Sequence, residues 1–198
     1  MKRVLLKISY LGTNYHGWQV QPNGITVQEE MQNALEKMYK VRLGITGCSR
    51  TDAGVHANEF YCHYDTELDI SERGIVFGLN SLLPADISVL EAKYVDNDFH
   101  ARYNAKGKNY IYRIYNSEIK NPFLADRALQ IPRELDLGRM NEFCKRICGK
   151  HDFYGFSSSG RTVTDTVRTI TDCSVYKEGK EIILSVTADG FLYNMVRI

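Results

Sequence analysis

The chain of 198 residues is 43% hydrophobic and 25% charged, a composition typical of a folded globular protein that excludes wholesale disorder. Its 25 Lys and Arg residues nearly balance its 24 Asp and Glu residues, so any anion-binding site must be local. No apolar stretch approaches the roughly 20 residues that a membrane helix needs, and the first ten residues make a poor signal peptide. Five cysteines without a Cys-x-x-Cys pair favour a reduced, cytoplasmic location and argue against a metal site.

The first half of the chain alternates between strand and helix patterns. Strands are indicated where apolar and polar residues alternate, and helices where apolar residues recur every three or four positions. One helix start is marked by Thr26 and Glu29, which form a capping box, and another by Asp69 or Ser71. The strands are expected at residues 3–10, 41–46, 60–64 and 87–95, and the helices at 27–38 and 70–83. This order, β-α-β-β-α-β, is the split βαβ pattern.

The second half repeats part of that order. Its strands are expected at residues 108–115, 167–175 and 182–188, with a helix at 137–147 and the start of another at 191–198. A naturally minimal domain and a chain that lacks its C-terminal segment both fit this pattern. The second is favoured, because a single helical turn is marginal without packing partners.

The sequence therefore predicts an α+β fold of two ferredoxin-like (split βαβ) halves, whose antiparallel sheets flank a central cleft. Residues 1–97 form the first, complete half, which carries the loop around Asp52. Residues 98–198 form the second half, in the order βαββα, with its last helix cut short and its final strand absent.

The densest polar segment is Gly47–Ala57, Gly-Cys-Ser-Arg-Thr-Asp-Ala-Gly-Val-His-Ala, which lies between two expected strands. A plain Asx-turn is the simplest interpretation of Asp52. The functional interpretation is a carboxylate at a cleft, kept ionised by a cation such as Arg50. His56 is a candidate base, but no Ser or Cys nucleophile is paired with it, so a catalytic triad is not supported.

Residues 99–117 combine cations with aromatic residues and contain no acidic residue. Arg102, Lys106 and Lys108 are suited to phosphates, while the interleaved tyrosines could stack on exposed RNA bases. An edge strand with a solvated basic face and tyrosines in the core explains the same composition equally well.

Two further loops are less specific. Trp18, the only tryptophan, is either a buried anchor of its loop or part of a surface that contacts a nucleotide. Arg161 follows three serines and a glycine, in either a phosphate-binding loop or a flexible linker.

Taken together, these segments resemble the tRNA pseudouridine synthase A family. The matching motifs are Tyr15-x-Gly-Trp-Gln-x-Gln21, Arg50–Ala57, Leu79–Asp86, Phe99–Arg102, Lys108–Arg113, His151–Phe153 and Phe191–Arg197, in the family's order. Two features depart from the family pattern. Ser49 stands where the family often has glycine, and the chain ends at Ile198 where the family continues.

The resemblance implies that uridine is isomerised to pseudouridine at position 38, 39 or 40 in the anticodon stem-loop of tRNA. It also implies a homodimer that needs no metal or organic cofactor. Asp52 matches the catalytic aspartate, Tyr110 the active-site tyrosine that contacts the target base, and Arg197 the basic residue that pairs with the aspartate. Arg50 would contact RNA or the active site. Candidate phosphate contacts are Arg102, Lys106, Lys108 and Arg161.

The reaction detaches uracil from the sugar at N1 and reattaches it at C5 without adding or losing an atom. A carboxylate could serve as nucleophile at sugar C1′ or uracil C6, or as base at C2′, and the sequence leaves these open. The target uridine lies in a stem and must be flipped out. Two alternative functions remain. The first is a protein without catalytic activity, either an RNA-binding module or an inactive truncated synthase. The second is a hydrolase that uses Asp52 with His56.

Overall fold

The computed structural model describes residues 1–158 and 164–198 and divides the chain into two compact units. Unit 1 is Met1–Ala105 and unit 2 is Lys106–Ile198, whereas the sequence predicts a boundary after residue 97. The boundary lies further along because the segment after β4 is bound to unit 1. The Arg3 guanidinium donates to the Phe99 carbonyl (2.7 Å), and Ala101 N–H donates to Nδ1 of buried His63 (3.2 Å).

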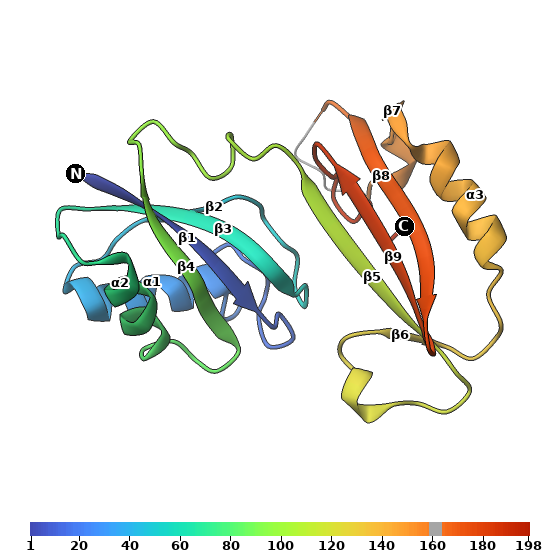
Figure 1. The fold of residues 1–198 in the computed structure, drawn as a ribbon, viewed down its shortest axis with the longest axis horizontal. Coiled ribbons are helices and arrows are strands. Elements are labelled where there is room, and N and C mark those ends of the chain that lie inside the picture. The colour runs from blue at the N-terminus through green and yellow to red at the C-terminus, as the bar shows by residue number, and fades with distance from the viewer. Residues whose placement is uncertain (159–163) are drawn as a thin grey trace. The chain divides into compact units, whose positions relative to one another are not determined.

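Unit 1 is a split βαβ fold with a four-stranded antiparallel sheet in the order β2-β3-β1-β4 (Figure 1). Its elements are β1 (Lys2–Tyr10), α1 (Val27–Tyr39), β2 (Ile45–Gly47), β3 (Ala57–Thr66), α2 (Glu72–Asn80) and β4 (Ile87–Val95). The element order that the sequence predicts is confirmed.

Both helices of unit 1 begin at side-chain caps. The Thr26 hydroxyl accepts the Glu29 N–H at 3.3 Å, and the Ser71 hydroxyl accepts the Gly74 N–H at 3.2 Å. Each cap satisfies a backbone donor that the first helical turn leaves unpaired. Of the two candidates for the second cap, Ser71 is therefore the correct one, whereas Asp69 forms an ion pair with Lys2 at 2.6 Å.

The core of unit 1 lies between the helices and one face of the sheet. The inward residues of β1, Val4, Leu6 and Ile8, are completely buried in a single cluster with apolar residues of both helices. The two helices pack against each other: a Cβ at Gly78 of α2 would approach the Met38 side chain of α1 to 3.0 Å. The helices and the inward face of the sheet therefore share one buried apolar core.

Unit 2 has a five-stranded sheet in the order β6-β5-β9-β8-β7. Its elements are β5 (Lys108–Asn116), β6 (Leu129–Ile131), α3 (Leu137–Ile147), β7 (Gly149–Asp152), β8 (Val167–Glu178) and β9 (Glu181–Ala188), with short 3-10 helices at Pro122–Leu124 and Tyr154–Phe156. The predicted strands β5, β8 and β9 and helix α3 are confirmed. Strands β6 and β7 were not predicted individually. The α+β class with split βαβ-like halves is likewise confirmed.

The end of the chain differs in detail from the expected helix start. Residues 192–198 form consecutive turns, in which Met195 N–H donates to the Leu192 carbonyl (3.1 Å) and Arg197 N–H to the Asn194 carbonyl (2.9 Å). Asn194 has φ +59°, the left-handed conformation that interrupts a right-handed helix. The turns place Leu192 and Met195 in a buried cluster of unit 2.

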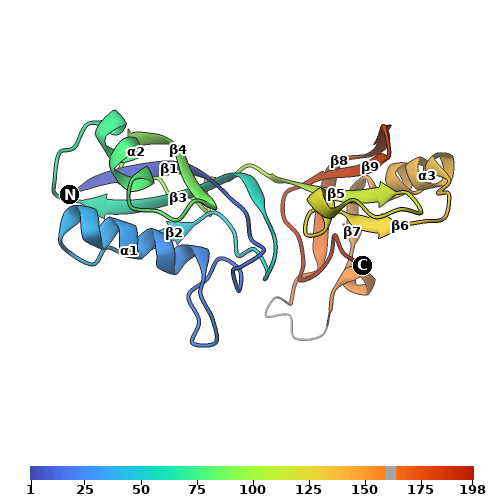
Figure 2. The same cartoon turned by 90° about the horizontal axis from the view of Figure 1, so that it is seen from below.

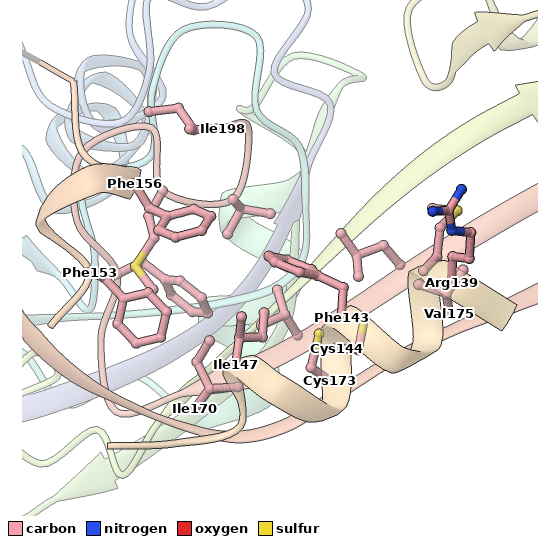
Figure 3. Close-up of a pocket in the computed structure, with 16 residues that line it drawn as sticks. Arg139, Phe143, Cys144, Ile147, Phe153, Phe156, Ile170, Cys173, Val175 and Ile198 are labelled. Carbon is pink, nitrogen blue, oxygen red and sulfur yellow. The ribbon is translucent and has the colours of Figure 1, made fainter. Parts of the chain in front are cut away.

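Unit 2 contains an apolar pocket of about 420 Å³ between α3, the sheet and the C-terminal turns (Figure 3). In Figure 3 the Arg139 side chain lies at one end and Phe153 and Phe156 at the other. The lining contains no carboxylate, so this pocket is not the site that the Asp52 motif predicts. Among the described residues, no helix is long and apolar enough to cross a membrane.

Candidate active site

Asp52 is half-buried in the loop that connects β2 to β3. The loop turns directly after it, where the Asp52 carbonyl accepts the Val55 N–H at 3.2 Å and Gly54 has φ +77°. Glycine adopts this left-handed conformation without a steric cost. The carboxylate is therefore carried by a tight turn at the end of the unit 1 sheet.

The segment Gly12–Trp18, which follows β1 and runs toward α1, holds this loop from one side; Figure 2 shows the connection in blue. Trp18 N–H donates to the Thr51 carbonyl (3.1 Å), and Gly54 N–H donates to the Tyr15 carbonyl (3.2 Å). These bonds fix the backbone on both sides of Asp52.

Close backbone contact between the two loops requires a residue without a side chain at Gly17. Gly17 has φ +86°, and a Cβ there would lie 2.5 Å from the Thr51 carbonyl oxygen. Any side chain would force the loops apart.

Trp18 confirms the buried-anchor interpretation. Its side chain is 2% exposed and packs against Phe60 with the ring centroids 4.3 Å apart. Gly47, at the start of the Asp52 loop, lies so close that a Cβ would meet the indole at 2.6 Å. The indole therefore fills space beneath the loop and does not present a face to a nucleotide.

His56 also has a structural bond. Its Nδ1 accepts the Gly12 N–H at 2.9 Å, which ties the end of the Asp52 loop to the end of β1. In this arrangement the neutral ring carries its proton on Nε2. Because the accepting nitrogen, Nδ1, is occupied by the backbone and Nε2 carries the proton, the geometry does not favour the hydrolase hypothesis, in which His56 acts as a base.

Three residues that hold the site were not identified from the sequence as such. The Tyr10 hydroxyl bonds the Thr51 hydroxyl at 2.8 Å, and the Tyr15 hydroxyl donates to the Asp86 carboxylate at 2.5 Å. Burial, followed by the bond to Asp86, raises the pKa of Tyr15 above its ordinary value. The sequence signals were the strand alternation that includes Tyr10 and the two matching motifs that include Tyr15 and Asp86, and neither kind of signal indicates these hydrogen bonds.

In unit 2, two motifs of the resemblance lie together. Tyr110 of β5 is half-buried opposite Val186 of β9, and its ring meets Phe191 edge-on with centroids 4.8 Å apart. Arg197 is exposed in the C-terminal turns of the same unit. The predicted pairing of Arg197 with Asp52 stays a prediction.

The predicted phosphate contacts differ in exposure. Arg50, Arg102 and Lys106 are exposed, and Lys108 is half-buried at the start of β5. Arg161 lies outside the described residues. Within residues 1–158 and 164–198, no group of three or more His, Cys, Asp and Glu side chains is arranged to hold a metal ion.

Comparison with known proteins decides the family. The sequence model of a family described as tRNA pseudouridine synthase matches residues 7–104 and 143–198, which include the Asp52 loop and the C-terminal turns. This chain belongs to the tRNA pseudouridine synthase family. It is accordingly an enzyme of the isomerase class, and the resemblance seen in the sequence is confirmed.

Several members of the family are similar to this chain over nearly its whole length. The tRNA pseudouridine synthase A of Ruminiclostridium cellulolyticum is 45% identical over the whole chain, which covers 81% of that protein. The tRNA pseudouridine synthase A 2 of Clostridium perfringens is 43% identical with the same coverage. The enzyme of Staphylococcus saprophyticus is 42% identical over 99% of this chain and 73% of its own length.

Proposed function

We propose that this synthase converts uridine to pseudouridine at position 38, 39 or 40 in the anticodon stem-loop of tRNA, with Asp52 as its catalytic carboxylate. The observation that supports the proposal most is the rigid mounting of Asp52. A half-buried acid in a tight turn, hydrogen-bonded through its neighbours to a partly buried loop, has the fixed geometry that catalysis requires. It lies in a chain whose family catalyses this class of reaction.

The chemistry is balanced within the substrate. The bond between N1 and C1′ breaks, the uracil turns, and a bond between C5 and C1′ forms; the proton on C5 is lost and N1 gains one. Asp52 would act as nucleophile at C1′ or C6, or as base at C2′. Each role needs the ionised carboxylate.

The target base must leave its stem before it can react, at a cost of a few kcal/mol. Tyr110 is proposed to stack on the extruded base and to recover part of that cost. Arg197 is proposed to keep Asp52 ionised, as the resemblance implies. Phosphate contacts are assigned to Arg50, Arg102, Lys106, Lys108 and Arg161. The enzyme is also proposed to act in the cytoplasm as a homodimer.

Sequencing-based mapping of pseudouridine tests the proposal. A tRNA transcript with uridines at positions 38, 39 and 40 is incubated with wild type and with Asp52→Asn, which keeps the size of the side chain but removes its charge. Three further transcripts each carry cytidine at two of these positions. We expect modification by wild type at one or more of the three positions and none by the variant. Modification confined to other positions, or equal modification by both proteins, would contradict the proposal.

A further inference from the structure

A second layer of hydrogen bonds lies behind the loop that carries Asp52. Tyr15 is 6% exposed, and its hydroxyl donates to the carboxylate of Asp86, just before β4, at 2.5 Å. The backbone of Asp86 also accepts the Leu11 N–H at 2.9 Å. Asp86 therefore holds both the start of the Gly12–Trp18 segment and its buried tyrosine.

The same tyrosine contacts the Asp52 loop directly. Its carbonyl accepts the Gly54 N–H at 3.2 Å, two residues after Asp52. Its own N–H donates to the Gly12 carbonyl at 3.0 Å, and Gly12 in turn donates to His56. A displacement of Tyr15 would thus be transmitted to both sides of the turn after Asp52.

The bond between Tyr15 and Asp86 is suited to fix that position. A buried hydroxyl without a partner is costly, and a carboxylate is a stronger acceptor than a neutral oxygen. The hydrogen bond to Asp86 therefore stabilises the observed orientation of the Tyr15 ring.

We propose that Tyr15 and Asp86 are positioning residues for the pseudouridine synthase reaction: their hydrogen bond sets the place of the Asp52 carboxylate without touching the substrate. This inference rests on the proposed role of Asp52. Small displacements of reacting groups cost large factors in rate while leaving binding unchanged. The bond should therefore act on kcat more than on KM.

Tyr15→Phe removes only the hydroxyl, and Asp86→Ala removes only its acceptor. The matched control is Tyr39→Phe, because the Tyr39 hydroxyl bonds the Tyr64 hydroxyl at 2.8 Å in the same core, between α1 and β3. We expect Tyr15→Phe and Asp86→Ala to lower kcat about 10-fold or more, with KM for tRNA within about two-fold of wild type. The double variant should be no worse than the poorer single variant, since both remove one interaction. Tyr39→Phe should leave kcat unchanged.

Trp18 provides a readout that does not depend on activity. It is the only tryptophan of the chain, and its backbone N–H donates to the Thr51 carbonyl in the Asp52 loop. Acrylamide should quench its fluorescence more in Tyr15→Phe and Asp86→Ala than in wild type or Tyr39→Phe. Equal quenching in all four proteins, or a kcat in Tyr15→Phe equal to that of Tyr39→Phe, would overturn the inference. Full activity of Asp52→Ala would instead overturn the proposed function, a result distinct from either.

Discussion

The two units use the same strand pattern but complete it differently. In unit 1 the order β2-β3-β1-β4 is closed by an antiparallel edge strand, and two helices cover one face. In unit 2, strands β8-β9-β5 are equivalent to β2-β3-β1 of unit 1, and β7 is an added edge strand beside β8. At the other edge, β6 pairs with β5 in parallel, where unit 1 has the antiparallel strand β4. Among the described residues, α3 is the α-helix that unit 2 contributes, and Leu192 and Met195 of the C-terminal turns join one of its buried clusters.

The buried cores of the two units differ as well. Unit 1 has one continuous core, whereas the buried apolar residues of unit 2 fall into two smaller clusters beside a pocket of about 420 Å³. Side chains next to open space lose part of their dispersion contacts. We infer that unit 1 is the more stable unit and that this stability keeps the Asp52 loop in a fixed position.

The largest expected effect comes from the same deletion made in each core. Ile8→Ala, in β1, removes a completely buried side chain and should cost unit 1 about 2–5 kcal/mol of free energy of unfolding. Ile170→Ala, in β8, removes a side chain that lines the pocket and should cost unit 2 less, near the lower end of that range. Hydrogen exchange of peptides from each unit measures the two costs separately. A larger cost for Ile170→Ala would break the comparison.

Matched glycines give the next largest effect. Gly17→Ala places a Cβ 2.5 Å from the Thr51 carbonyl, so it should lower kcat by about 100-fold through displacement of the Asp52 loop. Gly179→Ala, in the hairpin between β8 and β9, has a similar φ of +60° but open space around it, so it should cost only about 1 kcal/mol in stability. Steady-state kinetics and thermal unfolding of both variants check this contrast. Equal kcat values would show that the loop tolerates displacement.

A smaller effect tests whether each unit contacts the tRNA backbone. Arg102→Ala in unit 1 and Lys106→Ala in unit 2 should each reduce the slope of log affinity against log salt by about one. Lys93→Ala is the control, because Lys93 is already paired with Glu91 at 2.6 Å. Filter binding at several salt concentrations gives the slopes. An unchanged slope for either variant would contradict a phosphate contact at that residue.

The smallest effect concerns pH and unit 1 alone. Burial, followed by the nearby charges of Arg3 and His100, lowers the pKa of His63, while Asp65 opposes this shift. The unfolded chain therefore binds a proton on His63 more readily than the folded chain does. The contribution of this residue to stability is complete above about pH 6.5 and falls as the pH drops below it. His63→Gln should flatten the dependence of unfolding free energy on pH between about 5 and 7; an unchanged slope would refute this assignment.

The sequence predicted those features that depend on local pattern. The cap at Thr26, helix α3 and the long strands follow from spacing alone, whereas spacing left Asp69 and Ser71 as equal candidates for the second cap. Strands β6 and β7 were missed because three or four residues carry too little alternation. The boundary after Ala105 depends on Arg3 and His63, which contact residues far along the chain.

The hydrogen bonds that hold the Asp52 loop could not be predicted either, because they also join residues far apart in the sequence. Asp52 was identified from its motif, but its hydrogen-bonded framework was not. The bond between Tyr10 and Thr51 joins residues 41 apart in sequence, and that between Tyr15 and Asp86 joins residues 71 apart. Patterns of polarity indicate which face of a strand is buried, not which distant hydroxyl it meets.

The most direct test of the central claim, a catalytic Asp52 mounted on unit 1, is release of tritium from tRNA labelled at uracil C5. Wild type and Asp52→Ala are compared in this assay and in tRNA binding. Formation of pseudouridine expels the C5 hydrogen to water, whereas binding or backbone cleavage does not. We predict release by wild type, no release by the variant, and tRNA affinity of the variant within about three-fold of wild type. Tritium release by Asp52→Ala at the wild-type rate would contradict the account.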